Sequence, residues 1–426
     1  MVTQSVLAFK LEVTRDAITP HAGLALFGEF LHALKLPQWL DEAVPGPGSA
    51  AGYDPSGYVV PLVLMLHGGG RSLEDLRQVR HDEALRELLG LADLPSADAT
   101  GDWLRRMGAG TGLEALGEVH RRVLAWGLRR TKGRAFTLDI DATQIVAEKR
   151  EALRTYKGAV GYLPIVGHLA ENGLVVGEEF RAGNVSPNAR NAEFIRHCVA
   201  QMPAGTGIAH LRGDNAAYQA EIFNECETKG RTFAIGAPLD SAVLAAIAAI
   251  PDEAWRPYQN GVIAETVHSM DHTRKAFRLV VIRRPVQRDL WGNEEPTGRY
   301  RAIASNRTES AEATVAWYNA RGEHSENRLK ELKSGFAMER MPCGTLEANA
   351  VFFRIGALAY NLFCLFKRLA LPRSWRHHQV QTLRWRLYQT AGKVVRHAGA
   401  VYLKVCAAMF ALMEEIRTRC RELARA

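Results

Sequence analysis

Cysteine is scarce in this sequence of 426 residues, which holds six cysteines and no Cys-x-x-Cys pair. None of the six lies near histidines at the spacing of a zinc site, so the common zinc-binding modules are excluded. Isolated thiols of this kind are typical of a reducing compartment. The first residues lack the hydrophobic stretch of a signal peptide, and the most apolar run, 355–366, is too short to cross a bilayer. We therefore expect a soluble, cytoplasmic protein without a membrane partner.

The sequence also lacks the nucleophile motif of a hydrolase or phosphatase. The run HGGG at 67–70 could suggest the oxyanion-hole loop of a hydrolase, but no Gly-x-Ser-x-Gly motif accompanies it. We interpret this run as a turn that ends the apolar stretch before it. Internal repeats and low-complexity segments are absent as well.

Positive charge is in excess, and the excess is concentrated near the C-terminus. The formal net charge is +8 and the pI is about 9.2. From Lys367 onward, 13 Lys and Arg stand against 3 Glu, so the preceding residues are close to neutral. A local basic excess is a candidate phosphate-binding surface, and a solvated helical face explains it equally well.

The periodicity of the apolar residues changes along the chain. Residues 1–130 are typical of helices separated by Gly and Pro. From residue 135 the apolar residues alternate, and Asn172-Gly173 predicts a hairpin between two strands. We predict a mixed α/β fold. Its segments are a helical region (1–130), a sheet with helix-linked strands (131–237), a β-rich insertion (238–307), a helix-bearing segment (308–344) and a helical, basic region (345–426).

Two aspartates stand where predicted strands end. Asp141 closes the first strand in Asp-Ile-Asp-Ala-Thr, and Asp214 closes the fourth in Arg-Gly-Asp-Asn-Ala. Carboxylates at the ends of adjacent strands can share a metal ion, and two Mg²⁺ ions about 3.5–4 Å apart can activate an attacking hydroxyl and stabilise a leaving oxygen. An aspartate at a strand end can also simply cap a turn. Asp139 competes with Asp141, because alternation puts both on one face of the strand.

A predicted helix over 309–333 carries the third candidate, Glu326. At about 100° per residue, Tyr318, Glu326 and Lys333 fall within an arc of roughly 80°, with Arg321 to the other side. This face offers a carboxylate beside two cations that can bind phosphate oxygens. A salt-bridged surface helix is the competing interpretation.

These motifs together resemble those of DDE transposases of bacterial insertion sequences, in the branch marked by a Tyr–Arg–Glu–Lys signature. The strings TLDIDATQI and LRGDNAAY match the two aspartate motifs, and YNARGEHSENRLKELKSG carries the signature. The resemblance extends over residues 135–366 and includes the Arg-rich stretch 383–399. One feature departs from the common signature, since four residues instead of three separate Arg321 from Glu326.

The resemblance implies an RNase H-like catalytic core that is interrupted by a β-rich insertion. It implies cut-and-paste transposition, with Asp141, Asp214 and Glu326 as catalytic ligands of Mg²⁺, for which Mn²⁺ would substitute. It also implies double-stranded DNA as the partner and a homodimer on paired transposon ends. Relatives hold a flipped base on an aromatic of the insertion, for which Trp291 and Trp255 are candidates, although a core tryptophan is the simpler interpretation of each.

The expected DNA contacts are spread over the chain. Tyr318, Arg321 and Lys333 lie on the helix of Glu326, and Arg384 and Arg386 lie in the Arg-rich stretch. Residues 1–130 are our candidate for recognition of the terminal repeats. Two alternatives remain open: a metal-dependent nuclease that does not join strands, and a non-catalytic DNA-binding remnant of a transposase.

Overall fold

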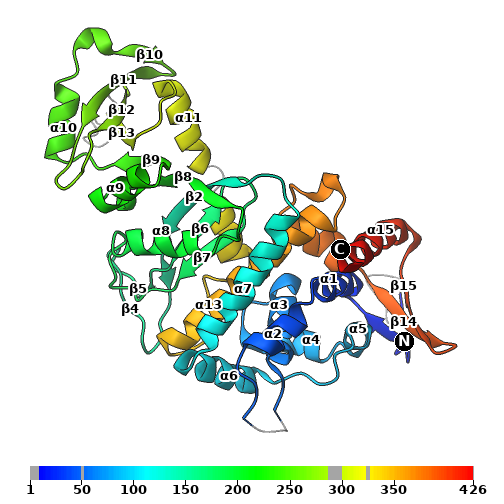
Figure 1. The fold of residues 1–426 in the computed structure, drawn as a ribbon. Coiled ribbons are helices and arrows are strands. Elements are labelled where there is room, and N and C mark those ends of the chain that lie inside the picture. Colours follow the sequence, from blue (N-terminus) through cyan, green and yellow to red (C-terminus); the bar gives the residue numbers. More distant parts are fainter. Residues whose placement is uncertain (1–8, 49–51, 286–299, 323–326, 426) are drawn as a thin grey trace, which may run out of the picture.

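The computed structural model describes residues 9–48, 52–285, 300–322 and 327–425. Its centre is a mixed β-sheet, helices of both chain ends cover one side, and a smaller lobe projects from one edge (Figure 1). A nine-stranded sheet runs through both parts, in the order β10 (Arg256–Tyr258), β11 (Gly261–His268), β12 (Phe277–Arg283), β13 (Tyr300–Ser305), β9 (Thr232–Ala237), β8 (Gly207–Gly213), β2 (Ala135–Ala142), β6 (Ile165–Leu169) and β7 (Val175–Glu179). This arrangement confirms the predicted mixed α/β class.

The N-terminal region is mainly helical, as predicted, and it packs around one long helix from near the C-terminus. Its helices are α1 (Ala22–Ala33), α2 (Leu36–Ala43), α3 (Pro55–Gly68), α4 (Leu76–Arg80), α5 (Glu83–Leu89), α6 (Ala97–Ala109) and α7 (Gly112–Arg129). Helices α3, α6 and α7 contact α13 (Leu346–Leu369). By length and composition α13 is apolar enough to cross a membrane, but 89% of its apolar window is buried inside the protein. We therefore assign it to the core.

Five strands of the sheet follow the alternation seen in the sequence. They are β2 (Ala135–Ala142), β6 (Ile165–Leu169), β7 (Val175–Glu179), β8 (Gly207–Gly213) and β9 (Thr232–Ala237). Strands β6 and β7 form the hairpin predicted at Asn172-Gly173, where Gly173 has a φ of 80°. Strands β8 and β9 run parallel to β2, after helices α8 (Asn191–Ala200) and α9 (Ala220–Thr228). Strand β2, the first of these five along the chain, therefore lies in the middle of the group.

The two faces of this sheet differ in character. Leu138 and Ile140 of β2 are buried on the face that α8 covers, where Gly167 approaches Phe194 and Cys198. Asp139 and Asp141 alternate with them and point to the other face. That face carries α11 (Ala311–Arg321), α12 (Asn327–Lys330) and α13. The polar side of the sheet is thus the side that the predicted catalytic helix covers.

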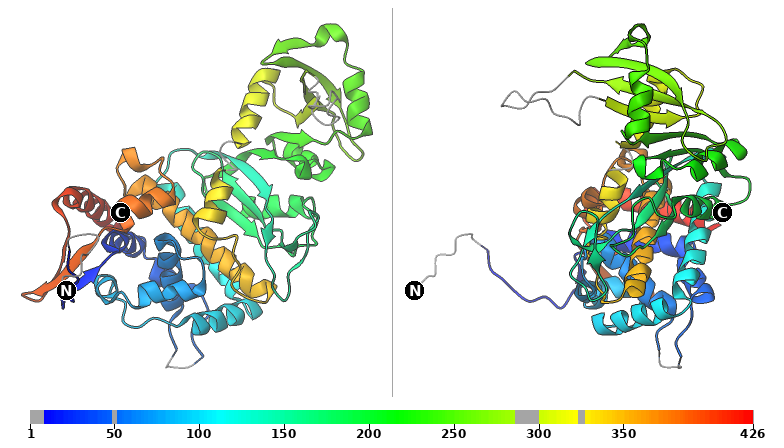
Figure 2. Two further views of the ribbon diagram at one scale, coloured as in Figure 1. Left: turned by 180° about the vertical axis from the view of Figure 1, so that it is seen from behind. Right: turned by 90° about the vertical axis from the view of Figure 1, so that its left-hand side faces the viewer.

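The described strands of the segment 238–307 extend this sheet and do not form a separate one. After α10 (Ser241–Ala248) come β10 (Arg256–Tyr258), β11 (Gly261–His268), β12 (Phe277–Arg283) and β13 (Tyr300–Ser305). Strand β13 pairs antiparallel with β9, so the hydrogen bonding continues from the core into the lobe. In Figure 2 this lobe and the hairpin near the C-terminus lie at opposite ends of the molecule.

Two expectations for the C-terminal part were wrong in detail. The predicted helix over 309–333 holds a π-helical segment, η5 (Glu331–Gly335), so a spacing of 100° per residue fails there. The region 345–426 contains a hairpin between α14 (Val380–Leu383) and α15 (Ala407–Arg425). Its strands are β14 (Gly392–His397) and β15 (Ala400–Lys404), and β1 (Ala17–Thr19) pairs with β14. Ala398 and Gly399 both have positive φ, as a tight hairpin turn requires.

A small sheet lies beside the end of β2. It is formed by β3 (Ile145–Val146), β4 (Leu153–Arg154) and β5 (Val160–Tyr162), with β5 in the middle. Thr143 donates its backbone N–H to the carbonyl of Pro164, so the chain stays tied to the main sheet as it leaves β2. This anchors the segment that follows Asp141.

Candidate active site

The register of β2 and β8 brings the two predicted aspartates together. Asp139 is the partner of Arg212 in this parallel pair, and Asp141 and Asp214 each follow two residues later. Neighbouring strands lie about 4.8 Å apart, and residues two apart share a face. The carboxylates of Asp141 and Asp214 therefore leave adjacent strands at one edge and on one face. Both side chains are partly exposed.

Asp139 and Arg212 form a closed ion pair beneath this edge. The guanidinium donates from Nε to Asp139 Oδ1 at 2.7 Å and from Nη2 to Oδ2 at 2.8 Å. It also donates to the Trp317 carbonyl at 2.6 Å and lies 5.0 Å from the centre of the Trp317 ring. The Asp139 side chain is fully buried. This geometry makes Asp139 a structural residue and leaves Asp141 as the carboxylate that faces outward.

Arg321 connects helix α11 to the edge. Its Nη1 lies 3.7 Å from Asp141 Oδ2 and 3.5 Å from the carbonyl oxygen of Ile140. Burial lowers the pKa of Arg321, but the carboxylates of Asp141, Asp214 and Asp139 together raise it above its usual value. A cation of this strength stays charged at every working pH. Arg321 therefore lies within electrostatic range of both Asp141 and Asp214.

Tyr318 lies under the site instead of lining it. The side chain is buried, and Arg301 and Arg321 lie 5.1 and 5.9 Å from its ring centre. A Cβ on Gly236 would come within 2.9 Å of its hydroxyl oxygen. The phenol therefore fills the space between α11 and β9, and it supports Arg321 through ring contact.

Asp214 also caps a turn, as the simpler interpretation of the sequence suggested. Its Oδ1 accepts the backbone N–H of Ala216 at 3.0 Å, at the start of η2 (Asn215–Ala217). One oxygen used in this way orients the carboxylate, because a capped aspartate has little rotational freedom. Capping and ligation are compatible here, since a carboxylate has two oxygens and about four lone-pair sites.

Two side chains anchor the segment after α11, one from α12 and one from η5. Arg328 donates to the carbonyls of Leu169 and Ala170, at 3.0 and 2.6 Å. Lys333 donates from Nζ to the Gln144 carbonyl at 2.9 Å, and burial lowers its pKa. Lys333 thus lies close behind the end of β2, beside the small sheet. Glu326 and Trp291 lie outside the described residues, so their predicted roles rest on the sequence.

The donor set of this edge fits a hard divalent cation. Asp141 and Asp214 supply carboxylate oxygens, which Mg²⁺ and Mn²⁺ prefer. Arg321 limits the net negative charge of the pair. Within the described ranges, no three His, Cys, Asp or Glu residues cluster as a metal site. Glu326, which lies outside those ranges, is the third ligand predicted from the sequence.

The residues that sequence reasoning missed are those that hold the edge in place. Arg212 binds Asp139, and Trp317 contacts Arg212 through its carbonyl and its ring; the sequence analysis singled out neither. A signal for Arg212 existed, because it lies two residues before Asp214 and so on the same strand face. Trp317 had no such signal, since its contact depends on how α11 crosses the sheet.

Comparison with known proteins identifies the family. A family model described as "Transposase DDE domain group 1" matches residues 5–426. The chain belongs to this family. DDE transposases move DNA by breaking and joining phosphodiester bonds, and they generally use divalent metal ions. No curated protein matches the sequence.

One solved structure with a similar course of the chain is described as the "Cryo-EM structure of piggyBac transposase synaptic complex with hairpin DNA". It is 11% identical, the match covers 95% of this chain and 84% of that chain, and the TM-score is 0.49.

The basic residues of this transposase near its C-terminus fall into two groups. Arg384 was expected to contact DNA, but it is buried and donates to the carbonyls of Leu66, His67 and Gly335. Arg384 thus ties the C-terminal region to α3, and this prediction was wrong. Arg386 is exposed, lies 5.1 Å from the ring centre of Trp375 and contacts His378 Nε2 at 3.2 Å. It stays available to a phosphate.

The structure also bears on the predictions for Trp255 and for the cysteines. Trp255 in the lobe is partly buried, with the Arg283 guanidinium 4.3 Å from its ring centre. That ring face is therefore covered by a cation instead of being open to a base. The six cysteines are free, and four of them are buried, which agrees with the interpretation as isolated thiols.

Proposed function

We propose that this protein catalyses cut-and-paste transposition of an insertion sequence by metal-dependent DNA cleavage and strand transfer. The family supports a DNA transposase in general. The observation that carries the finer proposal is the pair of aspartates at the ends of β2 and β8, with Arg321 3.7 Å from Asp141. We also propose that the five strands β7-β6-β2-β8-β9 correspond to an RNase H-like core of the Tyr–Arg–Glu–Lys branch.

Asp141, Asp214 and Glu326 are the proposed catalytic ligands. When Mg²⁺ is bound, it would activate the attacking oxygen and stabilise the leaving one. Asp214 is oriented by the backbone N–H of Ala216, and Asp141 is fixed by its place in β2. Arg321 has its charge beside the same edge, where it can bind a phosphate oxygen of the reacting strand. Lys333, behind the end of β2, is the second proposed phosphate contact.

The proposed partner is double-stranded DNA, both as transposon ends and as target. We further propose a homodimer on paired ends and a cytoplasmic protein that joins the nucleoid when bound to DNA. Tyr318 takes a supporting role in this proposal because its ring is buried beneath Arg321. Trp291 remains the proposed aromatic contact of the lobe, from the sequence alone.

A cleavage and joining assay tests the proposal. The substrate is the DNA that flanks the gene, with Mg²⁺ or Mn²⁺, and the proteins are wild type, Asp141→Asn, Asp214→Asn and Glu326→Gln. Each substitution removes a charge with little change of shape. We expect the wild type to cut and join ends, and each variant to bind DNA while cutting on the order of 10³-fold more slowly.

The other outcomes point to the alternative functions. Cutting without any joined product would indicate a nuclease. DNA binding without cutting by the wild type would indicate a non-catalytic remnant. Full activity of Asp141→Asn would remove the outer aspartate from the mechanism.

A further inference from the structure

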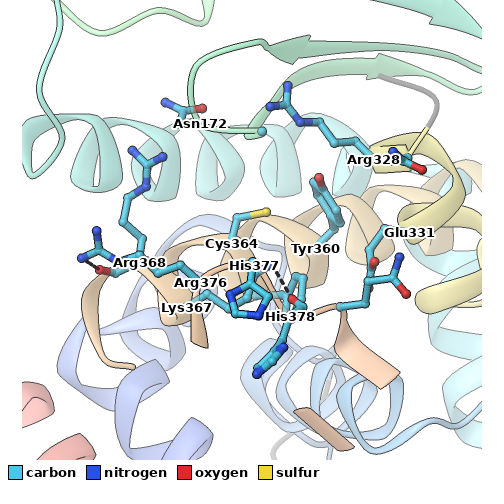
Figure 3. A pocket seen from close by; sticks show the side chains of 14 residues that line it. Asn172, Arg328, Glu331, Tyr360, Cys364, Lys367, Arg368, Arg376, His377 and His378 are labelled. Carbon is cyan, nitrogen blue, oxygen red and sulfur yellow. Dashed lines mark hydrogen bonds between the residues drawn. The ribbon is translucent and has the colours of Figure 1, made fainter. Parts of the chain in front are cut away.

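A cavity with a strongly positive lining lies between α12, the second half of α13 and the segment that follows α13 (Figure 3). Its volume is about 480 Å³. Five elements line it: the turn between β6 and β7, the start of α12, η5, the second half of α13 and the segment 376–379 that follows α13. In Figure 3, Arg328 projects from one side, and Arg368 and Arg376 from another. These elements lie far apart in the sequence, so the cavity was not visible in the basic stretch alone.

The lining holds four permanent cations and one carboxyl group. Arg328, Lys367, Arg368 and Arg376 are the cations, and Glu331 is the single acidic residue among the described lining residues. Burial raises the pKa of Glu331, and its carboxylate already accepts the backbone N–H of Val380 at 2.7 Å. The cavity therefore carries a clear net positive charge even before its two histidines titrate.

Neutral carbonyl oxygens hold each of these cations in place. Arg328 donates to Leu169 and Ala170, and Arg376 donates to the carbonyl of Arg368 at 3.0 Å. Lys367 donates to the carbonyl of His378 at 2.8 Å, and Arg368 to that of Glu171 at 3.4 Å. In the part of the chain that the structure describes, no carboxylate forms a salt bridge with any of the four. Carbonyl oxygens thus hold these cations, and Glu331 is the lining carboxylate whose charge acts on Lys367.

Burial and neighbouring positive charges disfavour the charged forms of these side chains. Burial lowers the pKa of Arg368, and the neighbouring charges of Arg376 and Arg328 lower it further. Burial likewise lowers the pKa of Lys367. Like charges held together in this way store repulsion, which an anion in the cavity would relieve. Surface arginines with acidic partners, such as Arg105 beside Asp102, do not share this property.

We propose that this cavity binds the phosphate backbone of a DNA strand, as a site distinct from the aspartate edge. This deepens the proposed function and rests on it. A cavity of this size exceeds a single phosphate ion, and its cations are spread over several elements, as successive phosphates require. Arg386 and Trp375 continue the basic surface beyond His378. Asn327 and Arg328 line the cavity, so DNA bound there lies against the start of α12.

Salt dependence of DNA binding tests this site. The proteins all carry Asp141→Asn, so that cleavage does not interfere, and the probe is a duplex of the DNA that flanks the gene. Arg376 is exposed, so Arg376→Gln should fold normally, which thermal melting verifies. We expect its affinity to fall about 3- to 10-fold near 0.15 M salt, and the slope of log K against log salt to decrease by about 0.9. In the double variant Arg368→Gln/Arg376→Gln, the slope of log K against log salt should decrease by about twice as much.

Arg196→Gln is the matched control, because it removes the same charge from an exposed arginine of α8, on the opposite face of the sheet from the aspartates. Its slope should equal that of the parent protein. The inference is overturned if Arg376→Gln and the double variant keep the parent slope, or if Arg196→Gln loses as much. A site for free phosphate only would show a different pattern: inorganic phosphate would raise the melting temperature of the parent and not of the variants, with DNA affinity unchanged. That result also overturns it.

The proposed function and this site fail separately. If the wild type never cuts DNA but Arg376→Gln changes the slope, the cavity binds DNA and only the proposed reaction falls. If the wild type cuts and the slope stays constant, the reaction stands and the cavity has no part in holding the DNA.

Discussion

Two neighbouring rows of residues cross the same strands and differ in almost every physical respect. The inner row consists of Arg212, Asp139 and His168, which are register partners on β8, β2 and β6. The outer row, two residues further along β2, holds Asp214 and Asp141. Asp139 is fully buried and accepts two hydrogen bonds from Arg212. Asp141 keeps 19% of its side chain exposed, and its cation lies 3.7 Å away.

The difference shows how one residue type takes two roles within one strand. A buried aspartate whose two oxygens are held by a guanidinium contributes to the fold, and it offers little to a metal ion. A carboxylate that reaches solvent beside a more distant cation can exchange that cation for a metal or shift it toward a phosphate. Depth within the sheet, and not the residue type, separates structure from chemistry here.

The largest effect should come from breaking the inner pair. Asp139→Asn leaves the Arg212 charge buried without its counter-charge, and we expect a loss of about 3–5 kcal/mol in the free energy of unfolding. Asp141→Asn removes the same charge from the outer row and should change it by less than about 1 kcal/mol. Urea unfolding followed by circular dichroism measures both. Equal losses in the two variants would erase the distinction between the rows.

Arg321 sharpens the comparison from the outer side. Arg321→Gln removes the cation near Asp141, and we expect cleavage to slow about 10- to 100-fold, the range seen when a residue that orients metal ligands is lost. Affinity for DNA should fall much less, because other cations contact the backbone. Single-turnover cleavage and filter binding on the same duplex separate the two effects. Arg321→Lys serves as the control that restores charge without the planar fork. A variant that cuts at the wild-type rate would remove Arg321 from the site.

The last test of the comparison concerns His168, the third member of the inner row. Burial, with the nearby charge of Arg328, lowers its pKa to about 3, and neither ring nitrogen has a hydrogen-bond partner among the described residues. In the unfolded chain His168 takes up a proton near pH 6.5. In the folded protein it takes one up only near pH 3. Its contribution to stability is therefore complete above pH 6.5 and is lost as the pH falls below it, by up to about 1.4 kcal/mol per pH unit.

His168→Leu should flatten this decline by about one proton. The slope of unfolding free energy against pH, measured by urea unfolding between about pH 6.5 and 4.5, gives the number directly. His67 and His120 are buried too, with pKa values lowered to about 3 and about 4, so they keep a residual slope in the variant. An unchanged slope in His168→Leu would place this histidine in a solvated setting.

The sequence predicted the strands of the core because their alternation is local. The pairs Leu138–Ile140 and Asp139–Asp141 already show which face is apolar, and Asn172-Gly173 predicts the hairpin between β6 and β7. The same pattern brought Asp141 and Asp214 to strand ends. It could not choose between Asp139 and Asp141, since alternation treats them alike and only the contact with Arg212 separates them.

Long-range packing explains where the sequence failed. Arg384 lies in an arginine-rich stretch and looked like a phosphate contact, but carbonyls of residues more than 300 positions earlier hold it in the interior. The hairpin β14–β15 has a weak alternating pattern, and its pairing with β1 joins the two ends of the chain. No local pattern indicates such pairings. The basic cavity has the same origin, as its cations come from separate elements.

The central claim is that Asp141 and Asp214 form a metal site. Its most direct test is a Mn²⁺ titration, in which electron paramagnetic resonance measures the free ion. It needs no DNA sequence and no cleavage. We predict that the wild type binds Mn²⁺, that Asp141→Asn and Asp214→Asn each weaken this binding by at least about tenfold, and that a control in an exposed aspartate, Asp102→Asn, does not. Unchanged affinity in both outer variants, with their fold intact, would contradict the assignment of this edge as the metal site.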